Sequence, residues 1–152
     1  MAPKDSSTDL FRQFRHTYNP SASLELVDNT MNGRTKGEIE AAIRTAIIKF
    51  EQEFMGRGPD DVKAFIVRDL VLIRLKGVLT PAERQLAKTA DGIDMVKRLR
   101  QNLIAQGRDK LCEQISDITG LKATALFTDI DAQIGERVIV FALERDLESS
   151  FR

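Results

Sequence analysis

Hydrophobic residues recur at intervals of three and four from position 39, which predicts a first helix over residues 35–55. Thr35 and Glu38 have the spacing of a capping box, in which each side chain satisfies a free backbone amide at the start of the helix. We expect this helix to end near Met55, because two glycines and a proline follow it closely. Its apolar face consists of Ile39, Ile43, Ile47, Phe50 and Phe54.

Two runs rich in β-branched residues follow, at 62–67 and 70–77, with Arg68-Asp69 between them. If Arg68-Asp69 is the turn, strand alternation fixes the pairing and puts six apolar side chains on one face. These are Val62, Ala64, Ile66, Val71, Ile73 and Leu75. Arg-Asp is not a preferred pair for a two-residue turn with positive φ, so a longer loop with another pairing is left open.

A second helical region begins at Thr80, because Thr80-Pro81-Ala82-Glu83 combines a capping threonine, a proline at the first helical position and a glutamate at the third. Asp91-Gly92 or Gly107 is expected to kink or split this region before Gly120 closes it. Its apolar face is predicted to contain Leu86, Ile93, Val96, Leu99, Leu103, Leu111, Ile115 and Ile118.

A second pair of strands is predicted at 123–129 and 137–143. The order αββαββ indicates an α+β fold with a four-stranded, mostly antiparallel sheet and helices on one face. We expect a mobile N-terminal arm at 1–34, a single α+β domain at 35–147 and a short tail at 148–152.

Both predicted hairpins carry apolar residues on both faces of the sheet, whereas helices from so short a chain cover one face. In the second hairpin, alternation places Leu126, Val138 and Val140 on one face and Phe127, Ile139 and Phe141 on the other. An exposed apolar sheet face usually marks an interface, so we predict a homodimer. The candidate dimer face consists of Phe65, Val67, Leu70, Leu72, Phe127, Ile139 and Phe141.

Composition narrows the classes of function. The chain has 23 basic and 23 acidic residues, and this balance disfavours nucleic acid as a partner. With one cysteine, Cys112, and one histidine, His16, it cannot supply the usual four ligands of a zinc site. We also predict no membrane span, no export signal and no cofactor, and we expect a cytoplasmic protein.

Three clusters are candidates for binding. Gly56-Arg57-Gly58 could present amides and a guanidinium to an anion, although the glycines are equally explained by the end of a helix. Asp129, Asp131 and Glu136 could hold an oxygen-ligated cation, although a plain turn is favoured. A basic stripe on the second helical region, usually the solvated face of such a helix, consists of Arg84, Lys88, Lys97, Arg98 and Arg100.

The stretches Gly-Arg-Gly-Pro at 56–59, Leu-Lys-Gly-Val-Leu-Thr-Pro-Ala-Glu at 75–83, Asp-Ile-Asp at 129–131 and Gly-Glu-Arg-Val-Ile-Val-Phe at 135–141 resemble the MpsC-like family of small bacterial proteins. The family is described as part of a sodium-translocating, membrane-potential-generating system, which implies a link to ion or inorganic-carbon transport. Since no membrane span is predicted, the resemblance implies a component peripheral to the membrane or regulatory. It implies no catalytic residues.

These observations leave three hypotheses. The first is a non-enzymatic dimeric module that binds a small anion or a partner protein, including a membrane protein, and regulates a membrane ion or bicarbonate system. The second is a nucleic-acid-binding module that uses the basic stripe. The third is an enzyme that works through Asp129, Asp131 and Glu136. We rank them in that order.

Overall fold

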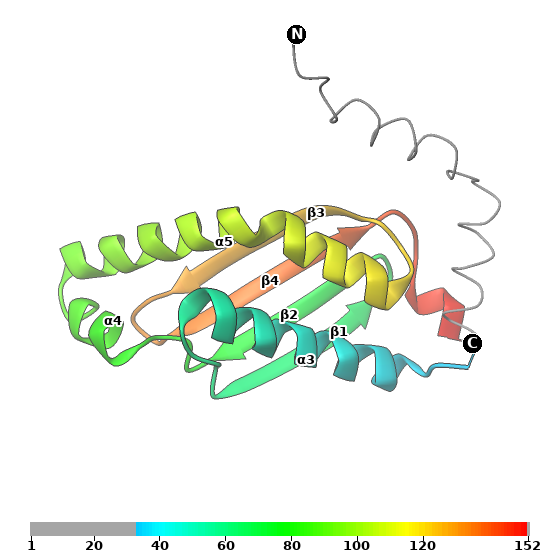
Figure 1. The fold of residues 1–152 in the computed structure, drawn as a ribbon, viewed down its shortest axis with the longest axis horizontal. Helices are drawn as coiled ribbons and strands as arrows, with labels where there is room; N and C mark the ends of the chain where they lie inside the picture. The colour runs from blue at the N-terminus through cyan, green and yellow to red at the C-terminus, as the bar shows by residue number, and fades with distance from the viewer. Residues whose placement is uncertain (1–32, 152) are drawn as a thin grey trace, which may run out of the picture. The chain divides into compact units, whose positions relative to one another are not determined.

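The computed structural model describes residues 33–151. These residues form a four-stranded antiparallel sheet in the order β1-β2-β4-β3, with the helices on one side. Figure 1 shows α3 over β1 and β2, and α5 along β3 and β4. The predicted α+β class is therefore confirmed. Most of the predicted arm, together with His16, lies outside the described residues.

Helix α3 (Lys36–Met55) begins and ends as its sequence predicts. The Thr35 hydroxyl accepts a hydrogen bond from the Glu38 amide at 3.2 Å, and the Glu38 carboxylate accepts one from the Thr35 amide at 2.7 Å. Gly56 ends the helix in the left-handed conformation, with φ of 82°. The predicted apolar face is buried at Ile39, Ile43, Ile47 and Phe50.

The first hairpin has the predicted register. Strands β1 (Asp61–Val67) and β2 (Leu70–Lys76) pair Val67 with Leu70 and Val62 with Leu75, so Arg68 and Asp69 form the turn. Arg68 adopts φ of 56°, as a tight hairpin turn requires. All six residues predicted to share one face are buried, so the pairing inferred from alternation is confirmed.

The second helical region divides into α4 (Pro81–Leu86) and α5 (Ala90–Thr119), but not at the predicted positions. The break lies at residues 87–89, and both Gly92 and Gly107 are inside α5. These two glycines permit close packing, because a Cβ at 92 would clash with the Leu86 carbonyl and a Cβ at 107 with the Phe50 ring. Helix α5 is therefore continuous past both of them.

The buried face of the second helical region also differs from the prediction. Leu86 and Leu99 were expected in the core but are exposed at 42% and 47%. Val96, Leu111 and Ile115 are buried as expected, and Arg100 is buried beside them at 1% exposure. The spacing of hydrophobic residues did not locate the buried face of α5, because Arg100 and Gly107 occupy two positions on that face.

The second hairpin corrects the predicted face assignment. Strand β3 (Ala123–Asp131) pairs with β4 (Glu136–Leu143) so that Leu126 lies opposite Phe141 and Phe127 lies opposite Val140. Ile139 and Phe141 are therefore in the core, below the helices, and are fully buried. Their placement on the candidate dimer face was wrong by one residue, because both faces of this hairpin are apolar and alternation could not choose between them.

The chain ends in a short 3₁₀ helix, η1 (Glu148–Phe151), within the predicted tail. The Arg68 amide donates to the Glu148 carboxylate at 2.9 Å, and the Glu148 amide donates to the Arg68 carbonyl at 3.2 Å. Lys36 Nζ forms an ion pair with Glu148 Oε1 at 2.8 Å. These contacts hold the end of the described chain against the first hairpin turn and the start of α3.

Candidate functional site

The face of the sheet opposite the helices, called here the open face, is uncovered among residues 33–151. The register divides it into four rows, each read in the order β1, β2, β4, β3. The first row is Asp61, Lys76, Glu136 and Asp131, and the second is Lys63, Arg74, Val138 and Asp129. The third row is Phe65, Leu72, Val140 and Phe127, and the fourth is Val67, Leu70, Ala142 and Ala125.

The open face is thus charged at one end and apolar at the other. Phe65 is 45% exposed and Phe127 is 60% exposed, and both lie in the third row. Five predicted members of the dimer face, namely Phe65, Val67, Leu70, Leu72 and Phe127, do share this surface. Val138 and Val140 take the places that were predicted for Ile139 and Phe141.

Side chains occupy part of both sheet edges. On β1, the Ile66 amide donates to Glu40 of α3 at 3.0 Å instead of pairing with a strand. On β3, the Ile130 amide donates to its neighbour Asp129 at 2.8 Å, and Arg108 Nη1 donates to the Leu126 carbonyl at 3.4 Å. Groups bonded in this way cannot pair with a further strand, so the edges are less available for association than the open face.

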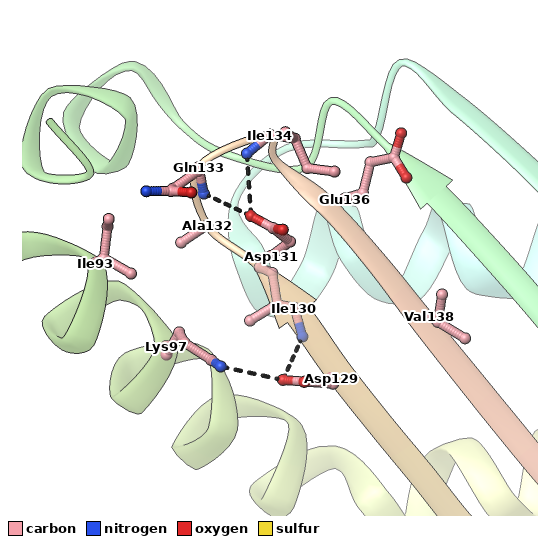
Figure 2. A pocket seen from close by; sticks show the side chains of 10 residues that line it. All are labelled: Ile93, Lys97, Asp129, Ile130, Asp131, Ala132, Gln133, Ile134, Glu136 and Val138. Carbon is pink, nitrogen blue, oxygen red and sulfur yellow. Dashed lines mark hydrogen bonds and ion pairs between the residues drawn. The ribbon is translucent and has the colours of Figure 1, made fainter. Parts of the chain in front are cut away.

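The loop between β3 and β4 borders an open hollow of about 450 Å³ (Figure 2). Asp131 accepts hydrogen bonds from the amides of Gln133 and Ile134, so its carboxylate caps the turn. Figure 2 shows Asp129 facing Lys97, 3.5 Å away. Glu136 instead pairs with Arg74 of β2 at 3.0 Å.

The three carboxylates of this loop are therefore engaged separately. Within residues 33–151, no cluster of three or more histidine, cysteine or acidic side chains is arranged to hold a metal ion. The structure does not bring Asp129, Asp131 and Glu136 together as a cation site. Turn capping and ion pairing account for all three.

At the predicted anion site, Arg57 is bonded within the protein. Its Nη1 donates to the Leu79 carbonyl at 2.7 Å, its Nε to the Gly58 carbonyl at 3.2 Å, and its Nη2 to Asp60 at 2.8 Å. Gly56 serves as the helix cap. Arg57 thus ties the end of α3 to the segment that precedes α4.

The basic stripe is not one surface. Arg100 is buried at 1% exposure, so including it in a solvated stripe was wrong. Lys97 faces Asp129, and Lys88 donates to Gln85 at 2.9 Å. Arg84 and Arg98 remain exposed, on α4 and α5 respectively.

Sequence reasoning missed a buried charge cluster of Glu51, Glu83, Arg100 and Arg137, which come from α3, α4, α5 and β4. Arg100 donates to both carboxylate oxygens of Glu83 at 2.6 Å and to the Val78 carbonyl at 2.6 Å. Its Nη1 lies 3.6 Å from a carboxylate oxygen of Glu51. One feature of the sequence could have indicated this cluster: Arg100 stands at a helical position that continues the buried face of α5.

The two acids of the cluster have opposite pKa shifts. Burial raises the pKa of Glu83, but hydrogen bonds from Arg100 and Thr80 outweigh burial and hold it below its ordinary value. Burial also raises the pKa of Glu51, and here the charges of Arg137 and Arg100 oppose it only in part. Burial lowers the pKa of Arg137. Arg100 and Glu83 therefore form the tightly bonded pair of the cluster.

We expect Glu83→Gln to lower the free energy of unfolding most at neutral pH. Because the folded-state pKa of Glu83 is depressed, its stabilisation is present above the unfolded pKa of about 4.3 and is lost as the pH falls through the folded-state value. Glutamine still suits the capping box, so the variant isolates the charge. Urea unfolding across this pH range measures the effect, and a deficit that stays constant with pH would contradict it.

The fold and these surfaces define a small α+β protein with one sheet face left open, charged at one end and apolar at the other. A sequence profile of the family described as "Na+-translocating membrane potential-generating system (MpsC)" matches residues 35–145, and the chain belongs to this family. No solved structure matches the chain.

Two relatives from Bacillus subtilis (strain 168) are themselves uncharacterised. YbcI is 39% identical over 117 residues, which cover 77% of this chain and 94% of YbcI. YrhF is 30% identical over 103 residues, which cover 67% of this chain and 84% of YrhF. The similarity to both therefore extends over most of each relative.

Proposed function

We propose that this chain is a non-enzymatic accessory protein that acts as a homodimer, associating through its open face. The observation that carries the proposal is the set of large apolar side chains exposed on that face: Phe65, Val67, Leu70, Phe127 and Val138. A contiguous apolar patch of this kind usually marks an interface. The partly blocked edges of β1 and β3 favour packing by the face over strand addition.

The partner of the dimer is proposed to be a protein of a membrane ion or bicarbonate transport system. The family description, which names a sodium-translocating system, supports this role. No helix in the described part of the chain has the length and apolar character needed to cross a bilayer. A protein partner is favoured over a small anion because Arg57 already donates to three groups within the fold.

Size-exclusion chromatography with light scattering tests the association. We expect the mass of the 152-residue chain to be twice 17.1 kDa at micromolar concentration and to fall towards one chain on dilution. A mass of one chain throughout the micromolar range would overturn the proposed dimer.

A further inference from the structure

We propose that the second copy packs on the open face with the two-fold axis parallel to the strands, so that β1 of one protomer lies over β3 of the other. This inference rests on the homodimer proposed above and gives it a geometry. The order of charged and apolar residues in the four rows of the open face carries the inference.

Face-to-face packing of two identical sheets requires a two-fold axis within the plane between them. An axis perpendicular to the strands would reverse the rows and set the charged end of one sheet on the apolar end of the other. Lys63 would then be buried against apolar side chains, which is costly for an unpaired charge. An axis parallel to the strands keeps like rows together and avoids this cost.

An axis parallel to the strands also sets β1 and β2 of one protomer over β3 and β4 of the other. The charged residues are distributed so that most of them then face a residue of opposite charge. Basic residues of the charged end lie on β1 and β2, at Lys63, Arg74 and Lys76. Three acidic residues of that end, Asp129, Asp131 and Glu136, lie on β3 and β4. Rotation therefore places Lys63 over Asp129 and Lys76 over Glu136. Arg74 lies over Val138 and keeps its ion pair with Glu136, and Asp61 meets a like charge in the outermost row.

The apolar end has a matching symmetry. The third row reads Phe65, Leu72, Val140 and Phe127, so reversal sets phenylalanine over phenylalanine at both ends and Leu72 over Val140 between them. The fourth row sets the larger Val67 and Leu70 over Ala125 and Ala142. A large side chain packed against a small one allows the side chains of two sheets about 10 Å apart to interdigitate.

Lys63 and Asp129 test this geometry most cleanly. Within one protomer they lie three strand spacings apart, about 14 Å. Across the proposed interface they would face one another at about the sheet spacing of 10 Å, a distance at which opposite charges still attract at low ionic strength. Asp129 is 76% exposed despite its ion pair with Lys97, so its charge remains accessible.

We expect Lys63→Glu and Asp129→Lys each to weaken the dimer about tenfold at low ionic strength, because each creates two like-charge pairs per dimer. An equimolar mixture of the two variants should regain native affinity as a heterodimer, because both interfacial pairs are then opposite in charge. Sedimentation equilibrium measures the dissociation constants. Arg98→Glu, on the exposed side of α5, is the control and should leave the dimer unchanged.

Cross-linking gives a second readout that does not depend on charge. In a Cys112→Ser background, we mix the Lys63→Cys chain with the Asp129→Cys chain. A bismaleimide shorter than about 14 Å, the width of three strand spacings, should join the two chains. Lys63→Cys alone should not be joined to itself.

The outcomes separate this inference from the proposed function. A native dimer with no recovery in the charge mixture and no mixed cross-link would overturn the strand-parallel geometry and leave the dimer standing. A native chain that is monomeric would overturn both. Recovery together with the mixed cross-link supports both.

Discussion

We expect Arg100→Met to lower the free energy of unfolding by about 3–5 kcal/mol, the range known for removing one partner of a buried ion pair. Arg100 is the shared cation of two buried acids, bonded to Glu83 and 3.6 Å from Glu51. Its removal also leaves the Val78 carbonyl without the hydrogen bond it receives at 2.6 Å. Urea unfolding at neutral pH measures the loss.

The matched control is Arg98→Met, two residues earlier on the exposed side of the same helix, which should change stability by no more than about 0.5 kcal/mol. Adding Glu83→Gln to Arg100→Met should recover part of the loss, because the carboxylate left without its cation is then neutral. Glutamine preserves the capping box at Thr80. A loss below about 1 kcal/mol for Arg100→Met, or no recovery in the double variant, would show that the pair is not a stabilising contact.

Phe127→Asp is expected to convert the dimer to a monomer, weakening association by roughly 30-fold or more, the effect of losing an aromatic anchor at an interface. Phe127 is 60% exposed within one chain, so the change removes apolar area that only the second copy would cover. Thermal unfolding of the variant should remain cooperative, because the side chain is outside the core. Light scattering at a series of concentrations measures the association.

Met95→Asp is a control with a second use. Met95 is 56% exposed on α5, in the helical layer, so the change introduces the same charge on the other side of the molecule. We expect the dimer to survive it. If Met95→Asp separates the protomers and Phe127→Asp does not, the interface lies on the helices and the open face is not the site of association.

The sequence predicts the first half of the fold well, because the signals there are local. Thr35 and Glu38, like Thr80 and Glu83, satisfy amides within one turn of a helix, and no distant residue is needed to recognise them. The first hairpin is equally local. Its core face is uniformly apolar, and its open face is charged away from the turn, so only one register fits.

The second half shows where local patterns fail. Val138, Ile139, Val140 and Phe141 are all apolar, so alternation cannot tell the core face of β4 from the open face. Pairing with β2, which sets Ile139 opposite Ile73, makes that choice. The sequence predicts a kink or split at Asp91-Gly92 or at Gly107, whereas the proximity of Leu86 and Phe50 shows that these glycines permit close packing.

The candidate surfaces divide in the same way. An exposed apolar sheet face could be predicted because five of its residues, Phe65, Val67, Leu70, Leu72 and Phe127, were identified from alternation. The order of charged residues across that face could not be predicted, because it depends on the strand order β1-β2-β4-β3. The buried cluster could not be predicted either, since Glu51, Glu83 and Arg100 come from three different helices.

By itself, the sequence determined the starts of α3 and α4, the first hairpin and the α+β class, because capping and alternation act between residues a few positions apart. Only the tertiary structure decided which residues of β4 face the core, that Arg100 is buried and which charges line the open face. Each of these depends on elements distant in the chain, and burial is a property of what packs over a residue. The residue's own polarity biases that outcome but does not set it.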